Sequence, residues 1–377
     1  MSRVNVMRPW LGDAEAAALR EVIESGWVAQ GPRVKAFEDA FAAHQQIPHA
    51  VALSSCTTSL HLALVVAGIG AGDDVVVPSF SFIATTNAVR YVGARPVFAD
   101  VDQVTGNLTA ETVTAALTPA TRAVIGVDQG GMPLDLQPLR DLLDPREIVV
   151  IEDAACAAGT IYRGRPAGAG AEIATWSFHP RKILTTGEGG MLTTARAAWA
   201  SRAATLREHA MSVSAAQRHQ QLVAPPETYD EVGFNYRMTD LQAAVGLVQL
   251  SRLDEQVARR RELAARYADG LTGVPGIRVS TDPPWGRSNF QSLWIEVGPG
   301  FGMDREGLLR LLAEHEISAR RGIMAAHRQP AYRELRPAAG LPVTEHLTDT
   351  TLILPLFHEL TEADQDRVIA AIGEARG

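Results

Sequence analysis

The chain has 377 residues, 46% of them hydrophobic and 21% charged, a composition typical of a folded globular protein and not of a disordered one. Its net charge of −8 argues against a nucleic-acid partner or an anionic membrane surface, and no apolar run reaches the roughly 20 residues of a transmembrane helix. Residues 1–25 lack a secretory signal, which predicts a cytoplasmic protein, and the only cysteines, Cys56 and Cys156, exclude a disulfide framework or a thiolate metal site, so no metal is expected.

The first third of the chain predicts a helix followed by a long alternation of strands and helices. The segment RVKAFEDAFAAH places Val34, Phe37 and Phe41 on one helix face and leaves Lys35 in solvent. Strands are predicted at 49–53, 75–78, 96–101, 123–127, 148–153, 173–178 and 190–194. Helices are predicted between them at 59–69, 83–92, 109–117 and 136–143. Since several strands are apolar without alternation, we expect an α/β fold whose mostly parallel sheet has helices on both faces.

The pattern changes after residue 195. A polar stretch at 213–228 predicts a loop, and the following apolar periodicity predicts one long helix over 239–271, on which Arg259, Arg260 and Arg261 form a solvated face. Strands are then expected at 290–297 and 352–356, and helices at 304–315 and 361–375. We therefore divide the chain into an N-terminal arm with a large α/β domain (1–240), and a connecting helix with a small α+β domain (241–377).

The use of basic residues singles out one lysine. Of the 35 basic residues only Lys35 and Lys182 are lysines. Arginine and lysine are similar as surface charges, but only lysine readily loses its proton and attacks a carbonyl. Lys182 follows a predicted strand end in WSFHPRKILTTGEGG, although an exposed loop lysine is the ordinary alternative.

Three further motifs also lie where predicted strands end. SSCTTSLHLAL (54–64) opens a helix whose N-terminus could bind a phosphate, or whose hydroxyls could simply cap it. Asp153 ends a strand, where it could pair with a cationic ring nitrogen or cap the next helix. Phe82 could stack on a ring or fill the core. A phosphate cup, an aspartate and a lysine at one sheet edge are together what pyridoxal 5′-phosphate (PLP) requires. A dinucleotide site is disfavoured, because GIGAG (68–72) follows a helix and precedes a strand.

The sequence resembles the DegT-type sugar aminotransferase family of PLP enzymes nearly end to end. The motifs that carry the resemblance are SGWVAQGPRVKAFEDAFA, SSCTTSLHLAL, VVVPSFSFIATTNAV, PVFADVD, VIEDAACAAG, WSFHPRKILTTGEGGMLTT, VGFNYRMTDLQAAVGLVQL and LILPLFHEL. The resemblance implies PLP fold type I, the aspartate-aminotransferase-like fold with a large and a smaller C-terminal domain.

The resemblance also implies roles for individual residues. Lys182 would hold the cofactor aldehyde as a Schiff base and move protons, and Asp153 would pair with the pyridine nitrogen. The remaining cofactor-binding positions comprise phosphate contacts at Cys56, Thr57 and Ser177, a ring contact at Phe82, and Asn235, which would reach the phosphate of the partner subunit in a homodimer.

Three positions depart from the family pattern. Cys56 stands where glycine is usual, Ser81 where threonine is usual, and Cys156 where glutamine or histidine contacts the phenolic oxygen of the cofactor. A thiol is a weak donor, so the contact at Cys156 is in question. Relatives that dehydrate sugars carry histidine in place of the lysine, so this chain resembles the transaminating branch.

These features predict a PLP-dependent aminotransferase that moves an amino group from glutamate or glutamine to a keto-sugar, commonly nucleotide-linked. Two alternatives stay open: amination of a keto-cyclitol or another PLP reaction on a sugar-like ring, and a PLP-binding regulatory protein without turnover. Arg237 and Arg321 are candidates for binding the donor carboxylate, with a structural role as the alternative for each. His327 matches a family position near the acceptor.

Overall fold

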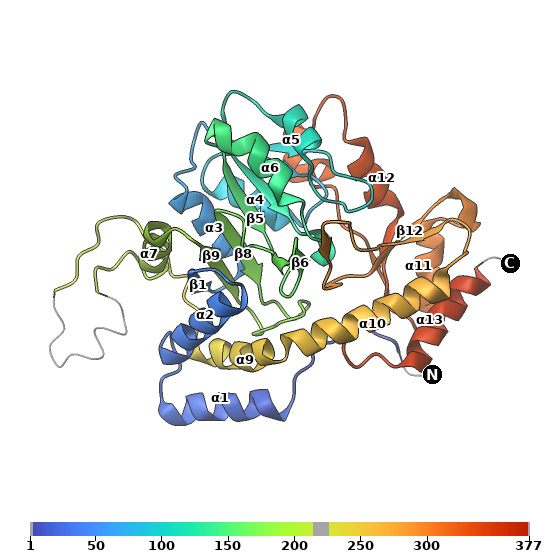
Figure 1. The fold of residues 1–377 in the computed structure, drawn as a ribbon, viewed down its shortest axis with the longest axis horizontal. Coiled ribbons are helices and arrows are strands. Elements are labelled where there is room, and N and C mark those ends of the chain that lie inside the picture. Colours follow the sequence, from blue (N-terminus) through green and yellow to red (C-terminus); the bar gives the residue numbers. More distant parts are fainter. Residues whose placement is uncertain (1–2, 214–225, 376–377) are drawn as a thin grey trace.

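The fold is built on a seven-stranded sheet (Figure 1), seen in a computed structural model that describes residues 3–213 and 226–375. The strand order is β1-β9-β8-β5-β4-β2-β3; β9 runs antiparallel to both neighbours, and the other neighbouring strands are parallel. The α/β class with a mostly parallel sheet is therefore confirmed. Most of the predicted loop at 213–228 lies outside the described residues. The strands are β1 (His49–Leu53), β2 (Asp74–Pro78), β3 (Arg95–Ala99), β4 (Thr121–Val127), β5 (Val149–Asp153), β8 (Ile173–Ser177) and β9 (Gly190–Thr194).

Helices cover both faces of this sheet because alternate strand residues point to opposite sides. On one face, Val75, Ile125 and Ile173 share a core with α3 (Cys56–Val66), α4 (Ile83–Tyr91) and α7 (Ala197–Leu206). On the other face, Trp176 packs with α2 and α9, and Val124 packs with α5 and α6. The helices of this second face are α2 (Pro32–His44), α5 (Ala110–Ala116), α6 (Leu136–Leu143) and α9 (Asp240–Ser251), with α1 (Asp13–Ser25) packed against α9.

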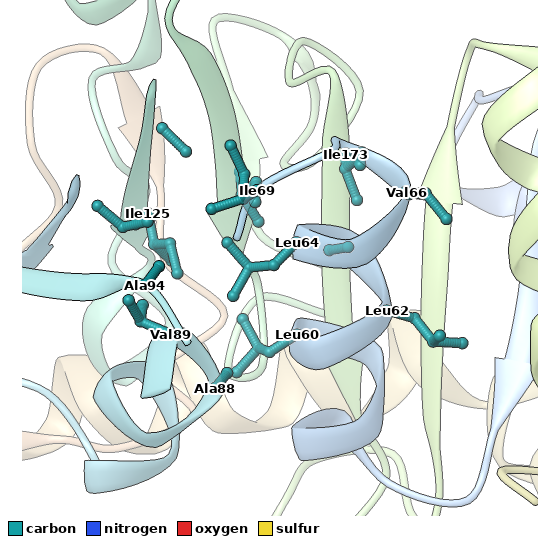
Figure 2. Close-up of a cluster of buried hydrophobic side chains, with 14 of the residues drawn as sticks. Leu60, Leu62, Leu64, Val66, Ile69, Ala88, Val89, Ala94, Ile125 and Ile173 are labelled. Carbon is teal, nitrogen blue, oxygen red and sulfur yellow. The ribbon is translucent and has the colours of Figure 1, made fainter. Parts of the chain in front are cut away.

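Helix α3 is apolar on two sides, which buries it deeply. Figure 2 shows Leu60 and Leu64 directed toward Val89 of α4, while Leu62 and Val66 point to the opposite side. All four leucine and valine side chains are at most 4% exposed. Burying each of them contributes about 1.5–3 kcal/mol, so this helix and its N-terminus are held firmly against the sheet.

The predicted single helix over 239–271 is wrong, because the chain forms two helices, α9 and α10 (Leu253–Leu271), that meet at Arg252. Arg252 has φ −112° and ψ 6°, outside helical geometry. Its guanidinium lies over the Trp10 ring, 4.3 Å from the centroid, and pairs with the buried Glu15. These contacts come from the N-terminal segment, so the local sequence gave no sign of the break.

A second core surrounds a four-stranded antiparallel sheet of order β10-β12-β14-β13. Residues of α10, α11 and α13 enclose it, and Val4 joins it through a bridge to Ile317, which brings the start of the described chain close to its end (Figure 1). The predicted strand over 290–297 is shorter than expected, since β12 begins only at Trp294. The elements are β10 (Ile277–Val279), β12 (Trp294–Val297), β13 (Arg320–Arg321), β14 (Thr351–Ile353), α11 (Arg305–Glu314), α12 (Pro342–Thr350) and α13 (Glu362–Glu374), with a small sheet of β11 (Gly286–Arg287), β6 (Ile161–Tyr162) and β7 (Arg165–Pro166).

The division of the chain between residues 240 and 241 is kept as a proposal. Helix α9 still packs on α1 and α2 beside the large sheet, and α10 runs on to the smaller sheet (Figure 1). No helix in the described ranges is both long and apolar enough to cross a bilayer.

Candidate active site

The predicted site residues meet at the carboxyl edge of the large sheet. Leu53 of β1, Gly190 of β9 and Ser177 of β8 lie in one row of the strand register. Asp153 at the end of β5 pairs with Thr175 on the neighbouring β8. The segments that follow these strand ends therefore surround one space, as expected for the carboxyl edge of an α/β sheet.

The N-terminus of α3 has free donors as well as a cap. Ser55 caps the helix by accepting the Thr58 N–H at 3.2 Å, which satisfies one orphan donor. Within the described chain, the N–H groups of Cys56 and Thr57 have no acceptor. A Cβ on Gly190 would lie 2.4 Å from the Ser55 carbonyl carbon and 2.6 Å from the Cys56 nitrogen, so only glycine allows β9 to approach this turn so closely. Capping and phosphate binding are thus compatible here.

Asp153 is buried at the end of a hydroxyl chain. Its Oδ2 accepts the Thr85 hydroxyl proton at 2.8 Å, and Ser81 lies 2.8 Å from the Thr85 Oγ1. Burial raises the pKa of Asp153, although the Thr85 hydrogen bond and the Lys182 charge oppose the shift. The carboxyl is therefore held rigidly and is ready to gain a cationic partner.

Lys182 lies in the same space, and its Nζ donates to the Cys156 Sγ at 3.1 Å. Burial disfavours its ammonium form, but the adjacent Cys156 sulfur and the Asp153 carboxylate outweigh that effect and raise the pKa of Lys182. Lys35, in contrast, is an exposed side chain paired with Asp39 on α2, as predicted.

The two cysteines take different positions around the lysine. Burial and the Asp153 charge raise the pKa of Cys56 well above its usual value, against a smaller effect of Lys182. The Cys56 thiol therefore stays neutral and adds no charge to repel a phosphate. Cys156 instead contacts the lysine amine directly.

Phe82 lines a cavity of about 530 Å³. Its side chain is 62% exposed, directly before α4, so it is available to a ring, whereas the neighbouring Phe80 is buried in the core. The Ser177 hydroxyl accepts only a long contact of 3.5 Å from the His179 N–H. The cavity wall also includes His179, Arg181, Gln291, Arg320, Arg321 and Met324.

The remaining candidate residues differ in their exposure and in the partners that they contact. Asn235 is exposed near the end of β1, and Arg237 forms a bridge to Leu53 and has no carboxylate partner in the described ranges. Arg321 pairs with Glu306 through two hydrogen bonds of 2.8 and 2.6 Å, which disfavours it as a free carboxylate receptor. His327 is fully buried, where Ser79 and Glu345 occupy both ring nitrogens, so it presents no atom to the cavity.

Sequence reasoning missed three kinds of residue. Thr85 could have been found, because it follows Ser81 by four residues at the start of a helix and both are hydroxyl residues. Arg181 and Arg320 line the cavity from segments far apart in sequence. Gln291 carried no sequence signal, since it was assigned to a strand.

These side chains fit PLP on structural grounds: free helix-terminal N–H groups for the phosphate, a buried carboxyl for the ring nitrogen and a lysine amine for the aldehyde. The described part of the chain contains no group of three or more histidine, cysteine or acidic side chains placed to hold a metal.

Residues 9–373 match the model of the DegT/DnrJ/EryC1/StrS aminotransferase family. The chain belongs to this family. It is a PLP-dependent transaminase, as the sequence predicted. Among solved structures it is similar to TlmJ, an aminotransferase from Streptoalloteichus hindustanus (37% identity, 99% of this chain and 98% of TlmJ covered, TM-score 0.91). It is also similar to Spr1654 from Streptococcus pneumoniae, solved in its PMP form (26%, 100% and 99%, 0.93) and in its PLP form (25%, 99% and 98%, 0.92). A third similar structure is DesI in the presence of its TDP-sugar product (31%, 100% and 94%, 0.90).

Proposed function

We propose that this aminotransferase moves the amino group of glutamate or glutamine to the keto group of a nucleotide-linked sugar. The observation that carries the proposal is the Lys182 amine near the buried Asp153 at one sheet edge. A cavity of about 530 Å³ lies beside this edge, lined by Phe82 and by Arg181, which precedes the lysine. The acceptor class is supported by the similarity to DesI, which was solved with its TDP-sugar product. A cytoplasmic location and the lack of a nucleic-acid partner stay predictions from the sequence.

Each side chain of the site has a task in this proposal. PLP supplies an aldehyde for the amine and an electron sink for the carbon that loses its proton. Asp153 keeps the ring nitrogen protonated, and Thr85 orients that carboxylate. Lys182 would hold the aldehyde through its amine and, once the donor amine has taken its place, would move a proton at the substrate carbon. The hydrogen bond from the Lys182 Nζ to the Cys156 Sγ, 3.1 Å long, would orient the amine within the site.

The donor carboxylate requires a cation that is not already paired. Arg237 meets this condition, and so do Arg181 and Arg320 on the cavity wall, for which the described chain offers no carboxylate. Arg321 meets it less well because Glu306 holds it. We therefore keep Arg237 as the sequence candidate for the donor carboxylate.

Visible absorbance tests the proposal directly. The purified enzyme is expected to show a yellow band that glutamate or glutamine bleaches to the amine form of the cofactor. A nucleotide keto-sugar, but not a free keto-cyclitol, should then restore the band. Restoration by the cyclitol alone would assign the acceptor to the alternative class. A band that no amino donor changes would favour a PLP-binding protein without turnover.

We further propose a homodimer in which Asn235 completes the phosphate site of the partner subunit. Asn235 is exposed in the single chain, and its side chain makes no hydrogen bond to another described residue. An Asn235→Ala variant should bind PLP roughly 10- to 100-fold more weakly, as expected for losing about 1.5–3 kcal/mol of a hydrogen bond to a charged group. A spectroscopic titration of the cofactor-free protein measures this affinity.

Mixed dimers test where Asn235 acts. Dimers of Lys182→Ala chains are expected to be inactive, and dimers of Asn235→Ala chains to need excess PLP. Co-expression of the two variants should produce dimers with one intact site and restore activity at low PLP. Absence of restoration in purified mixed dimers would mean that Asn235 serves its own chain.

A further inference from the structure

The backbone on both sides of Lys182 is held by one side chain from a distant segment. The Ile183 N–H donates to the Gln291 Oε1 at 2.7 Å, and the Gln291 Nε2 donates to the Arg181 carbonyl at 2.6 Å. These two groups belong to the peptide planes that meet at the Lys182 Cα. The single amide of Gln291, which is 7% exposed, therefore restrains both dihedral angles of the lysine.

The same segment also forms hydrogen bonds with the chain around Cys156, whose side chain contacts the lysine amine. Asn289 is fully buried, and its Nδ2 donates to the carbonyls of Cys156 and Ala158, each at 2.8 Å. Its Oδ1 accepts the Gln291 N–H at 2.7 Å. Residues 289–291, which we call the clamp, thus fix both chain segments whose side chains meet at the 3.1 Å contact between Lys182 and Cys156.

The clamp is itself locked in a costly conformation. Phe290 has φ +49°, in the left-handed region that a bulky residue rarely adopts. Arg260 of α10 donates to the Phe290 carbonyl at 2.9 Å and to the Gln291 carbonyl at 2.7 Å. Arg260 is 3% exposed, and its guanidinium has no carboxylate partner in the described ranges; burial lowers the pKa of Arg260 to about 10. The expectation that Arg260 lies on a solvated helix face is therefore wrong, because the periodicity does not show which residues α10 meets.

We propose that Gln291 is a positioning residue that fixes the backbone conformation of Lys182, and that the clamp keeps the lysine amine in contact with the Cys156 sulfur. Arg260 and the left-handed backbone of Phe290 hold the clamp in a strained conformation. In this conformation the side-chain amides of Asn289 and Gln291 reach the edge of the large sheet. The clamp directly precedes β12, so the position of the reacting amine depends on how the smaller sheet packs against the large one. This inference rests on the proposed role of Lys182 as the reacting amine.

Gln291→Ala tests the clamp in the full-length dimer, with Gln365→Ala as the matched control. Gln365 is also buried and donates one hydrogen bond, to Leu263, far along the chain in α13. The first readout is the rate at which cofactor-free protein forms the visible band with PLP. The second is the pH midpoint of that band, and the third is the half-reaction with glutamate, resolved into its saturating rate and half-saturating concentration.

Gln291→Ala is expected to slow band formation and the saturating rate by roughly 10- to 100-fold, because small misplacements of a reacting group have effects of this size. The pH midpoint should shift, and the half-saturating concentration should change less than about twofold. Gln365→Ala should match the wild type in all three readouts. Gln291→Glu keeps an acceptor for Ile183 but sets a carboxylate against the Arg181 carbonyl, so its rates should fall between the two.

The outcomes separate the clamp from the proposed function. If Gln291→Ala resembles Gln365→Ala, the clamp is structural only and the inference is overturned. If Gln291→Ala does not fold, a folded Gln291→Glu with wild-type rates overturns it equally. A wild-type chain that forms no visible band would overturn the proposed role of Lys182, and the clamp with it.

Discussion

A Lys182→Ala variant is expected to lose both half-reactions by at least about 10⁴-fold, the upper range for a positioned proton-transfer group, because the covalent contact and the proton carrier disappear together. The fold should persist, since the lysine side chain makes a single hydrogen bond within the described chain, to Cys156, and belongs to no hydrophobic core. Stopped-flow absorbance with glutamate measures the first half-reaction, and circular dichroism follows the fold.

The composition of the chain supplies an unusually clean control for this variant. Lys35 is the only other lysine, it is exposed, and it pairs with Asp39 away from the sheet edge. Lys35→Ala should therefore keep wild-type rates. Borohydride reduction of the PLP-loaded enzyme should attach the cofactor to the peptide that contains Lys182, and peptide mass mapping has only two lysines to distinguish. Turnover by Lys182→Ala at the wild-type rate would refute the mechanism.

Asp153→Asn is expected to slow the half-reaction by about 10²–10³-fold while leaving the cofactor-free protein as stable as the wild type or more so. The rate falls because a neutral amide cannot hold the ring nitrogen in its cationic form, and losing one preorganised electrostatic contact has an effect of this order. Stability is kept because burial raises the pKa of Asp153: the ionised carboxylate is unfavourable in the folded chain at neutral pH, and asparagine removes that charge. The amide oxygen can still accept from Thr85.

Asp74→Asn is the control for Asp153→Asn, because it changes an aspartate at the opposite edge of the large sheet. Asp74 begins β2 and pairs with Arg95, whose hydrogen bond lowers the pKa of Asp74 despite burial, with help from Thr118. Its stabilising effect is therefore present at neutral pH and is lost as the pH falls through its folded pKa. Asp74→Asn should lower the free energy of unfolding by on the order of 1–3 kcal/mol and leave the half-reaction unchanged. If both variants lost only stability, Asp153 would be structural.

Much of this architecture follows from local sequence. The apolar strands and their order along the chain predicted the large sheet, because residues buried on both faces need helices on both sides. The strand ends predicted where Asp153 and Lys182 would meet, because neighbouring parallel strands end at one edge. Ser55 and Thr58 show that capping and an open N-terminus coexist, which the sequence could only pose as alternatives.

The wrong predictions share a physical cause. Hydrophobic periodicity describes a single helix or strand and gives no information about the elements that pack against it. The sequence around Arg252 is typical of a helix, and its contacts with Trp10 and Glu15 appear only in the folded chain. Arg260 fits a solvated helix face by its spacing, but in the folded chain it donates to the Phe290 carbonyl. Gln291 matches a strand pattern, yet its position is set by a loop more than 100 residues earlier in the chain.

The sequence by itself therefore determined the class of fold and the cofactor, and it predicted the residues that would hold that cofactor, because each depends on residue type at a strand or helix end. Only the tertiary structure decided which arginines are free, why His327 is closed to the cavity, and how Asn289 and Gln291 hold the two sides of the lysine amine. These features depend on hydrogen bonds between segments distant in sequence, and such bonds leave no periodic trace in either partner.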